Sequence, residues 1–149
     1  MPYSAEPIPP EIIHTMLDAQ WQTYTGSIPE PTWVVVNSGT QAPRVDLVPG
    51  DAVVIRLGIP GETETLRDFW AYLDRTNLVE LELHTQVSRQ RLYDLKQEIR
   101  RIIHSQMHSL TDYQVVRYRD FQEITQEQLN VWQGRITISL ENNRLSTET

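Results

Sequence analysis

The feature that most constrains the fold is a change of hydrophobic period between residues 79 and 108. In VELELHT, which starts at Val79, apolar and polar residues alternate, as in a strand that buries one face. In the SRQRLYDLKQEIRRIIHSQMH that follows, apolar residues recur every three or four positions and predict a helix over about 88–108, with Ser88 as N-cap. Its apolar stripe comprises Leu92, Leu95, Ile99, Ile102, Ile103 and Met107. The pattern therefore predicts a sheet with a helix packed against it.

The rest of the chain predicts a second helix and several short strands. Pro10 suits a first helical position, and the spacing after it predicts a helix over about 10–23. The apolar side of this helix comprises Ile12, Ile13, Met16, Leu17 and Trp21. β-Branched and aromatic runs predict strands at 32–37, 44–48, 52–58, 78–85, 113–124 and 129–141. Residues 66–74 fit either a helix, through Leu66, Phe69, Trp70 and Leu73, or a strand, and the short β segments on either side favour a strand near 68–74. The segment IPGETE, 59–64, is predicted to be a loop.

Alternation in the last two predicted strands indicates which side chains share a face. In 113–124 the residues of one parity are Val115, Arg117, Arg119 and Phe121. In 129–141 the predicted core residues are Val131, Ile136, Ile138 and Leu140.

These elements predict a single α+β domain over residues 1–149. We expect a mainly antiparallel sheet with a long helix packed on one face, plus an N-terminal helix and extended terminal arms. The proline-rich residues 1–9 are predicted to form an N-terminal arm, residues 10–141 the α+β core, and residues 142–149 a polar C-terminal tail.

The composition disfavours several classes of function. The formal net charge is −7, and such a surface repels nucleic acid on average, so a protein that reads base sequence is disfavoured. The absence of cysteine removes disulfides, thiolate nucleophiles and Cys-ligated zinc. No apolar run approaches the roughly 20 residues of a membrane span, and the start lacks the pattern of a secretory signal. We therefore expect no membrane contact and synthesis in a cytoplasm.

Acidic residues on neighbouring strands raise the possibility of a magnesium-dependent nuclease. The candidate ligands are Asp46, Asp51, Glu80 and Glu82. The familiar nuclease pattern places a lysine two residues after the second acid, whereas His84 follows Glu82 at that spacing. The only lysine, Lys96, falls inside the predicted helix. The glutamates are therefore interpreted as the polar face of a strand.

Other catalytic and metal patterns are also incomplete. His104 and His108 are four residues apart on the predicted helix, but Ser105 stands where a zinc protease has its glutamate. No GxSxG elbow and no glycine-rich phosphate loop are present. The sequence thus predicts no catalytic residue, no metal ligand and no cofactor, and the protein is expected not to be an enzyme.

The predicted helix 88–108 is basic in an acidic chain. Residues 88–104 carry a net charge of +3, which leaves −10 on the remainder. A solvated polar face is the simple interpretation. Base stacking is disfavoured because Tyr93 is the only aromatic residue there. The sharper interpretation is that this face meets the acidic part of an identical subunit, as in a head-to-tail ring.

The order of these elements resembles the neck proteins of tailed phages and archaeal tailed viruses, and among them the tail terminator, or tail completion, family. The resemblance lies in the pattern of LVELELHT, SRQRLYDLKQEIRRIIHS, YQVVRYRDFQEI and WQGRITISLE, and covers about residues 45–141. The N-terminal arm and first helix are longer than this pattern needs, and residues 58–75 do not map onto it.

The resemblance implies an α+β fold, a ring of six subunits and a structural role without catalysis. Such rings end tail-tube polymerisation and join the tube to the head connector, stopper or adaptor, while genomic DNA passes through the lumen without sequence-specific binding. The protein is then made in the host cytoplasm and resides in the neck of the virion. By position, the candidate residues for subunit contacts are Glu80, Glu82, Arg89, Arg91, Lys96, Arg100 and Arg101.

Two other classes of protein stay open. One is a small metal-dependent nuclease, or another enzyme, on an α+β scaffold. The other is a cytoplasmic binding module that forms dimers. Mass in solution and DNA cleavage with magnesium separate these possibilities.

Overall fold

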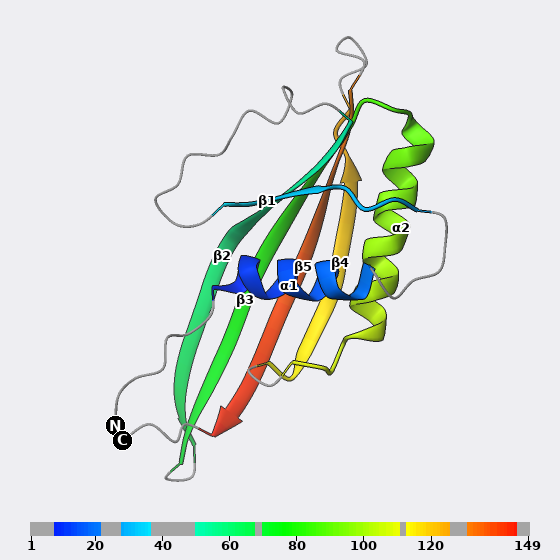
Figure 1. The fold of residues 1–149 in the computed structure, drawn as a ribbon. Helices are drawn as coiled ribbons and strands as arrows, with labels where there is room; N and C mark the ends of the chain where they lie inside the picture. Colours follow the sequence, from blue (N-terminus) through cyan, green and yellow to red (C-terminus); the bar gives the residue numbers. More distant parts are fainter. Residues whose placement is uncertain are drawn as a thin grey trace.

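The computed structural model describes residues 8–21, 28–36, 50–67, 70–110, 113–125 and 131–145, with the backbone alone at 59–67, 70–75 and 142–145. The chain is an α+β protein with a five-stranded mixed sheet and two helices (Figure 1). Its elements are α1 (Pro9–Trp21), β1 (Thr32–Val36), β2 (Asp51–Arg67), β3 (Trp70–Thr85), α2 (Arg89–Ser105), β4 (Val115–Glu123) and β5 (Trp132–Leu145). This architecture confirms the predicted α+β fold with a helix packed on a sheet.

The strands lie in the order β1-β2-β3-β5-β4. β1 runs parallel to β2, with Thr32 opposite Ala52, whereas the other three pairings are antiparallel. Both helices share one apolar core with a single face of the sheet, where Val53, Leu81 and Ile136 are fully buried. Figure 1 shows α1 lying across the strands and α2 running along them on the side of β4.

β2 and β3 form one long hairpin, so the loop predicted at 59–64 is wrong. The backbone pairing continues through this segment, with Pro60 opposite Asn77, after a register shift between Leu57 and Pro60. Proline has no N–H to donate, and it is tolerated here because the irregularity interrupts the regular ladder. The strands predicted near 68–74 and at 78–85 consequently belong to one strand, β3.

Helix α1 forms for the reason its sequence indicates. Ile13, Met16, Leu17 and Trp21 are buried, as their spacing predicts. The Trp21 ring meets the Trp33 ring edge to face, with centroids 5.5 Å apart, which fixes β1 against the helix. Pro9, assigned to the N-terminal arm from the sequence, is the first residue of α1.

Helix α2 begins as predicted and ends early. The Ser88 hydroxyl accepts the N–H of Arg91 at 3.1 Å, which confirms the N-cap. The predicted stripe is fully buried from Leu92 to Ile103. The helix ends at Ser105 and not at 108, because the carbonyl of Met107 already accepts the N–H of Val116 in β4, at 2.9 Å.

A bulge in β4 overturns the parity predicted for this strand. The pairing with β5 shifts between Tyr118 and Asp120, which inserts one extra residue. Val116 and Tyr118 therefore face the core before the bulge, and Phe121 faces it afterwards. Val115 and Phe121, predicted to share a face, are on opposite faces.

The C-terminal strand is longer than the sequence indicates. All four predicted core residues of β5 and its start are buried: Val131, Ile136, Ile138 and Leu140. The strand continues to Leu145, opposite Tyr72, so the tail predicted at 142–149 is in part a strand. The strand predicted at 44–48, residues 1–7 of the predicted N-terminal arm and residues 146–149 of the predicted tail lie outside the described residues. No helix in the described part is long and apolar enough to cross a membrane.

Candidate functional site

The start of α2 is held by a buried ion pair. Arg91 Nη2 lies 2.7 Å from Asp51 Oδ2, and these side chains are 10% and 14% exposed. The other carboxylate oxygen of Asp51 accepts the hydroxyl of Thr85 at 2.6 Å. Arg91 also donates to the carbonyl of Pro29 at 2.6 Å. The pair joins β2, β3, α2 and the segment before β1, so the charge of Arg91 is used within the subunit.

Two further arginines of α2 have carboxylate partners in the same chain. Glu98 is 1% exposed, and Arg101 Nε donates to both of its oxygens, at 3.0 and 3.2 Å. Arg89 Nε donates to Glu123, at the end of β4, at 3.0 Å. Much of the positive charge that the sequence places on this helix is therefore neutralised by the fold.

Lys96 and Arg100 differ, because they lie against aromatic rings. The Lys96 ammonium is 4.8 Å from the centre of the Tyr93 ring and 5.0 Å from that of Phe121. Arg100 stacks over Tyr118, 5.9 Å from the ring centre. Neither cation has an ion pair with a carboxylate in the described part of the chain. We name these five residues, Tyr93, Lys96, Arg100, Tyr118 and Phe121, the cation–aromatic seam.

The seam lies between α2 and β4. Its three helical members recur at intervals of three and four residues and so form one stripe. The rings of Tyr93 and Phe121 meet edge to face at 5.7 Å. Burial raises the pKa of Tyr118 to about 12; nearby Asp120 also raises it, while the positive charge of Arg100 opposes both. The Tyr118 phenol therefore stays neutral at physiological pH.

A glycine gives the seam its shape. A Cβ atom at Gly134, on the neighbouring strand β5, would lie 2.5 Å from Cε2 of Phe121 and 3.4 Å from Cδ1 of Leu92. Only the absence of a side chain at Gly134 lets the Phe121 ring occupy this position. Gly134 thereby positions one ring under Lys96.

The predicted contact residues Glu80 and Glu82 lie on the face of the sheet away from the helices. Glu82 accepts a hydrogen bond from Arg56 at 2.7 Å and pairs with His84 at 3.2 Å. The bond from His84 lowers the pKa of Glu82, Arg56 and Arg135 lower it further, and burial opposes them. His84 Nδ1 and Arg56 Nε are buried, and neither has a hydrogen-bond partner among the described residues.

The acidic residues proposed for a nuclease are not brought together. Asp51 lies opposite Thr85 in the sheet, and both side chains are on the face that the helices cover. Glu80 and Glu82 are on the other face, because side chains alternate along a strand. Asp46 lies outside the described residues. Across the described residues, no group of three or more His, Asp or Glu side chains is placed to hold a metal ion.

The two histidines near the end of α2 also separate. His104 is the penultimate residue of the helix, and its ring edge faces Tyr118 at 6.4 Å. His108 lies beyond the helix, where its Nδ1 is 3.0 Å from the carbonyl oxygen of Gln114. Because the helix stops at Ser105, they do not form the pair that an i, i+4 spacing on one helix would give.

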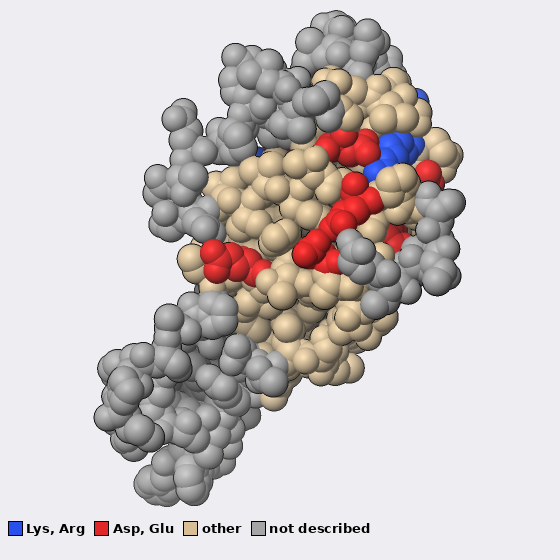
Figure 2. All heavy atoms as spheres, viewed as in Figure 1, with Lys and Arg blue, Asp and Glu red and all other residues tan. Residues whose placement is uncertain are grey.

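The side of the molecule that carries α1 is acidic. Exposed Glu11, Asp18 and Glu30 lie in or near α1 and β1, and we name them the acidic flank. The described residues 8–21 and 28–36 contain no lysine or arginine. Figure 2 shows carboxylates spread across this side and basic side chains in one small area towards α2.

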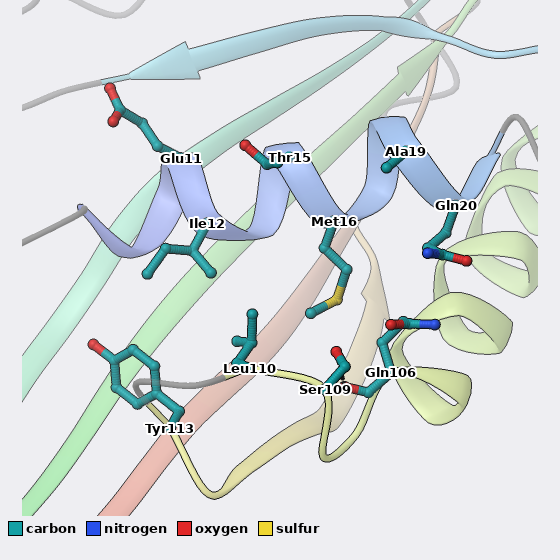
Figure 3. Close-up of a pocket in the computed structure, with 10 residues that line it drawn as sticks. All are labelled: Glu11, Ile12, Thr15, Met16, Ala19, Gln20, Gln106, Ser109, Leu110 and Tyr113. Atoms are coloured by element: carbon teal, nitrogen blue, oxygen red, sulfur yellow. Dashed lines mark hydrogen bonds between the residues drawn. The ribbon is translucent and has the colours of Figure 1, made fainter.

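A groove of about 420 Å³ lies beside the acidic flank, between α1 and the connection from α2 to β4. Figure 3 shows Ile12 and Met16 pointing from α1 towards Leu110 and Tyr113, while Glu11 and Thr15 point away from them. The groove is lined mostly by apolar atoms and holds no nucleophile paired with a base. It adds apolar surface to the acidic flank and does not resemble an active site.

Sequence reasoning missed the aromatic half of the seam. Strict alternation in 113–124 groups Phe121 with Val115 and not with Tyr118, because the bulge in β4 leaves no mark in a single sequence. The helical half of the seam could have been predicted, since Tyr93, Lys96 and Arg100 are spaced to lie on one side of a helix.

The burial of Glu98 could also have been predicted, because it falls beside Leu95 and Ile99 on the apolar side of the helix, three residues before Arg101.

No protein-family model matches the sequence, and no curated protein is similar to it. Function is therefore inferred from the fold and from side-chain geometry.

Proposed function

We propose that the chain is a structural virion protein of a tailed virus, a ring-forming tail terminator or related neck component without catalytic activity. Copies of the chain form a homo-oligomeric ring, expected to be a hexamer, that joins the tail tube to a head connector, stopper or adaptor protein. DNA passes through the lumen without sequence-specific binding.

The observation that carries this proposal is the separation of charge across α2. On one side, Lys96 and Arg100 have no carboxylate partner in the described part of the chain. On the other side, the acidic flank carries the carboxylates of Glu11, Asp18 and Glu30. A closed ring of identical subunits needs two different, complementary surfaces, because each subunit meets its two neighbours through opposite sides.

Two further properties support the same role. The elements that carry the resemblance, β3, α2, β4 and β5, are adjacent in the fold and share one core. A net charge of −7 also suits a conduit for DNA, because an acidic surface does not retain the DNA that must pass through it. A basic lining would retain it, since phosphate contacts with basic residues add up steeply along a duplex.

The direct test is to measure the mass of the purified chain in solution, alone and with tail-tube protein, and to search purified particles by mass spectrometry. We expect a ring-sized oligomer, formed alone or on the tube, and the chain among the proteins of the particle. A chain that stays monomeric in both conditions and is missing from particles would contradict the proposal.

The competing hypothesis is a metal-dependent nuclease. It predicts DNA cleavage by the isolated chain with magnesium, and loss of that cleavage in Glu80→Gln. We expect no cleavage by either protein, since Asp51 lies on the opposite face of the sheet from Glu80 and Glu82.

The predicted contact residues are not equally suited to an assembly test. Reversing Arg101 to Glu would leave buried Glu98 beside a second carboxylate, and removing Arg91 would leave Asp51 unpaired. Either change destabilises the subunit itself. Arg100 is exposed and has no carboxylate partner within the described segments, so its reversal tests assembly most cleanly.

A further inference from the structure

The seam presents positive charge that is oriented but not neutralised. The aromatic faces of Tyr93, Phe121 and Tyr118 hold the cations of Lys96 and Arg100 in place. A partner that binds here does not have to order these side chains, which lowers the entropic cost of association. The seam therefore fits a surface that offers carboxylates among small or apolar side chains.

The acidic flank offers such a surface on the same chain. Asp18 is exposed and has no hydrogen-bonding or ionic partner in the described part of the chain. Small Thr15 and Ala19 are exposed beside it, and the groove with Ile12 and Met16 adjoins them. Glu11 and Asp18 are seven residues apart, which is about 10 Å along the helix.

The two surfaces cannot meet within one subunit. Arg91 and Arg100 are nine residues apart, about two and a half helical turns, and so project from opposite sides of α2. Arg91 reaches Pro29, beside the acidic flank, whereas Arg100 reaches Tyr118 of β4. A contact between seam and flank is therefore a contact between two copies.

We propose that the cation–aromatic seam of one subunit docks on the acidic flank of a second copy, with Arg100 and Lys96 meeting the carboxylates of α1. This inference rests on the proposed function, for which it names the interface. The contact is head-to-tail, because each copy uses its seam on one side and its flank on the other. Every seam and every flank is occupied only when the subunits form a closed ring.

Nucleic acid is the less favoured occupant. The seam contains two cations, Lys96 and Arg100, and the protein as a whole is strongly acidic. Binding to a phosphate backbone gains strength from several basic contacts along the strand, which this surface does not supply.

The absence of native cysteine permits a crosslinking test. Asp18→Cys and Arg100→Cys are made as separate proteins and mixed with a short bis-maleimide crosslinker. We expect a dimer that contains one copy of each variant, and a ladder of larger products when both substitutions are in one chain. Each variant alone should give little product, because equal positions do not face each other in a head-to-tail contact.

Charge reversal supplies the energetic test. Arg100→Glu and Asp18→Arg should each weaken association about tenfold or more, in the range measured for close charge pairs across interfaces. The double variant in one chain should recover most of the lost affinity, because the charges are then exchanged. Gln122→Glu, on the other face of β4, is the control and should assemble as the native chain does.

The outcomes separate the interface from the function. If both reversals assemble normally and the crosslinks are absent while the native chain still forms a ring, the interface is wrong and the proposed function stands. If the native chain neither assembles nor enters particles, the proposed function fails as well. Binding of a fluorescent single-stranded oligonucleotide that Arg100→Gln abolishes, with assembly unchanged in that variant, would assign the seam to nucleic acid. Arg100→Gln also covers the case in which Arg100→Glu does not fold.

Discussion

The two sides of α2 use arginine in opposite ways. At the start of the helix, Arg91 is 10% exposed and bonded to Asp51 and the carbonyl of Pro29. Half the helix further on, Arg100 is exposed and stacked on Tyr118, and it has no carboxylate partner among the residues that the structure describes. The first charge is part of what holds the subunit together, and the second is left available to a partner. The two residues are of the same type and lie on the same helix, and their burial and neighbours distinguish them.

This difference changes how the charge pattern of the sequence is interpreted. A helix with a net charge of +3 between residues 88 and 104 reads as one basic face. In the structure three of its basic residues, Arg89, Arg91 and Arg101, are paired with carboxylates of the same chain. The part left for association is small, consists of Lys96 and Arg100, and is placed between aromatic rings.

The largest expected effect comes from breaking the buried pair. Arg91→Met leaves the Asp51 carboxylate buried and unpaired, which should lower the free energy of unfolding by about 3–5 kcal/mol. Urea denaturation followed by circular dichroism measures this change. Arg100→Met, on the exposed side, is the matched control and should lose less than about 1 kcal/mol. Equal losses in the two variants would abolish the distinction between the sides of α2.

The next largest effect concerns the shape of the seam. Gly134→Ala places a methyl group 2.5 Å from the Phe121 ring, which must move, at an expected cost of about 1–3 kcal/mol in unfolding free energy. In a Phe121→Ala background the same substitution should cost much less, because the clashing ring is gone. A cost that is unchanged in this background would show that the glycine does not act through Phe121.

A smaller effect is expected for the cation of the seam itself. Lys96→Met removes the contact with two rings and should cost about 0.5–1 kcal/mol in unfolding free energy, the usual range for exposed cation–π pairs. A double-mutant cycle with Tyr93→Leu isolates the contact. Lys96→Arg keeps the charge over the rings and should retain most of the stability.

The smallest effect at neutral pH is expected for Tyr118. Its pKa is raised to about 12 from an ordinary 10, so the folded state favours the neutral phenol. The stability that this gives is complete below pH 10 and is lost as the pH rises through 12. The difference in tyrosinate absorbance between the native chain and Tyr118→Phe, recorded against pH, measures the pKa. Ionisation of Tyr118 at the ordinary pKa would mean that the seam is more hydrated than its geometry indicates.

The sequence predicted the elements that have strong periodicity. Both helices, the buried stripe of α2, the Ser88 cap and the core residues of β5 are confirmed, because apolar spacing and capping are local signals. It failed where pairing between strands decides the outcome. Pro60 and Gly61 are typical of a loop, yet their segment is a strand because β3 pairs with it.

Around α2, too, local features could be predicted and long-range contacts could not. The sequence identifies the cations of α2 but not their partners, since Asp51 and Glu123 are far from them in the chain. The interface role of Glu80 and Glu82 stays a prediction, and the structure places them on the face of the sheet opposite to α2. The bulge that turns Phe121 towards Lys96 depends on pairing with β5, which no local pattern encodes.

The irregular β4 strand has a further consequence, for aggregation. It forms one margin of the sheet, where unpaired N–H and C=O groups could template a strand from another chain. The bulge in β4 and its charged residues Arg117 and Arg119 make this edge strand a poor template for fibril growth. The bulge and the charges thereby protect this edge of the sheet from open-ended pairing with strands of other chains.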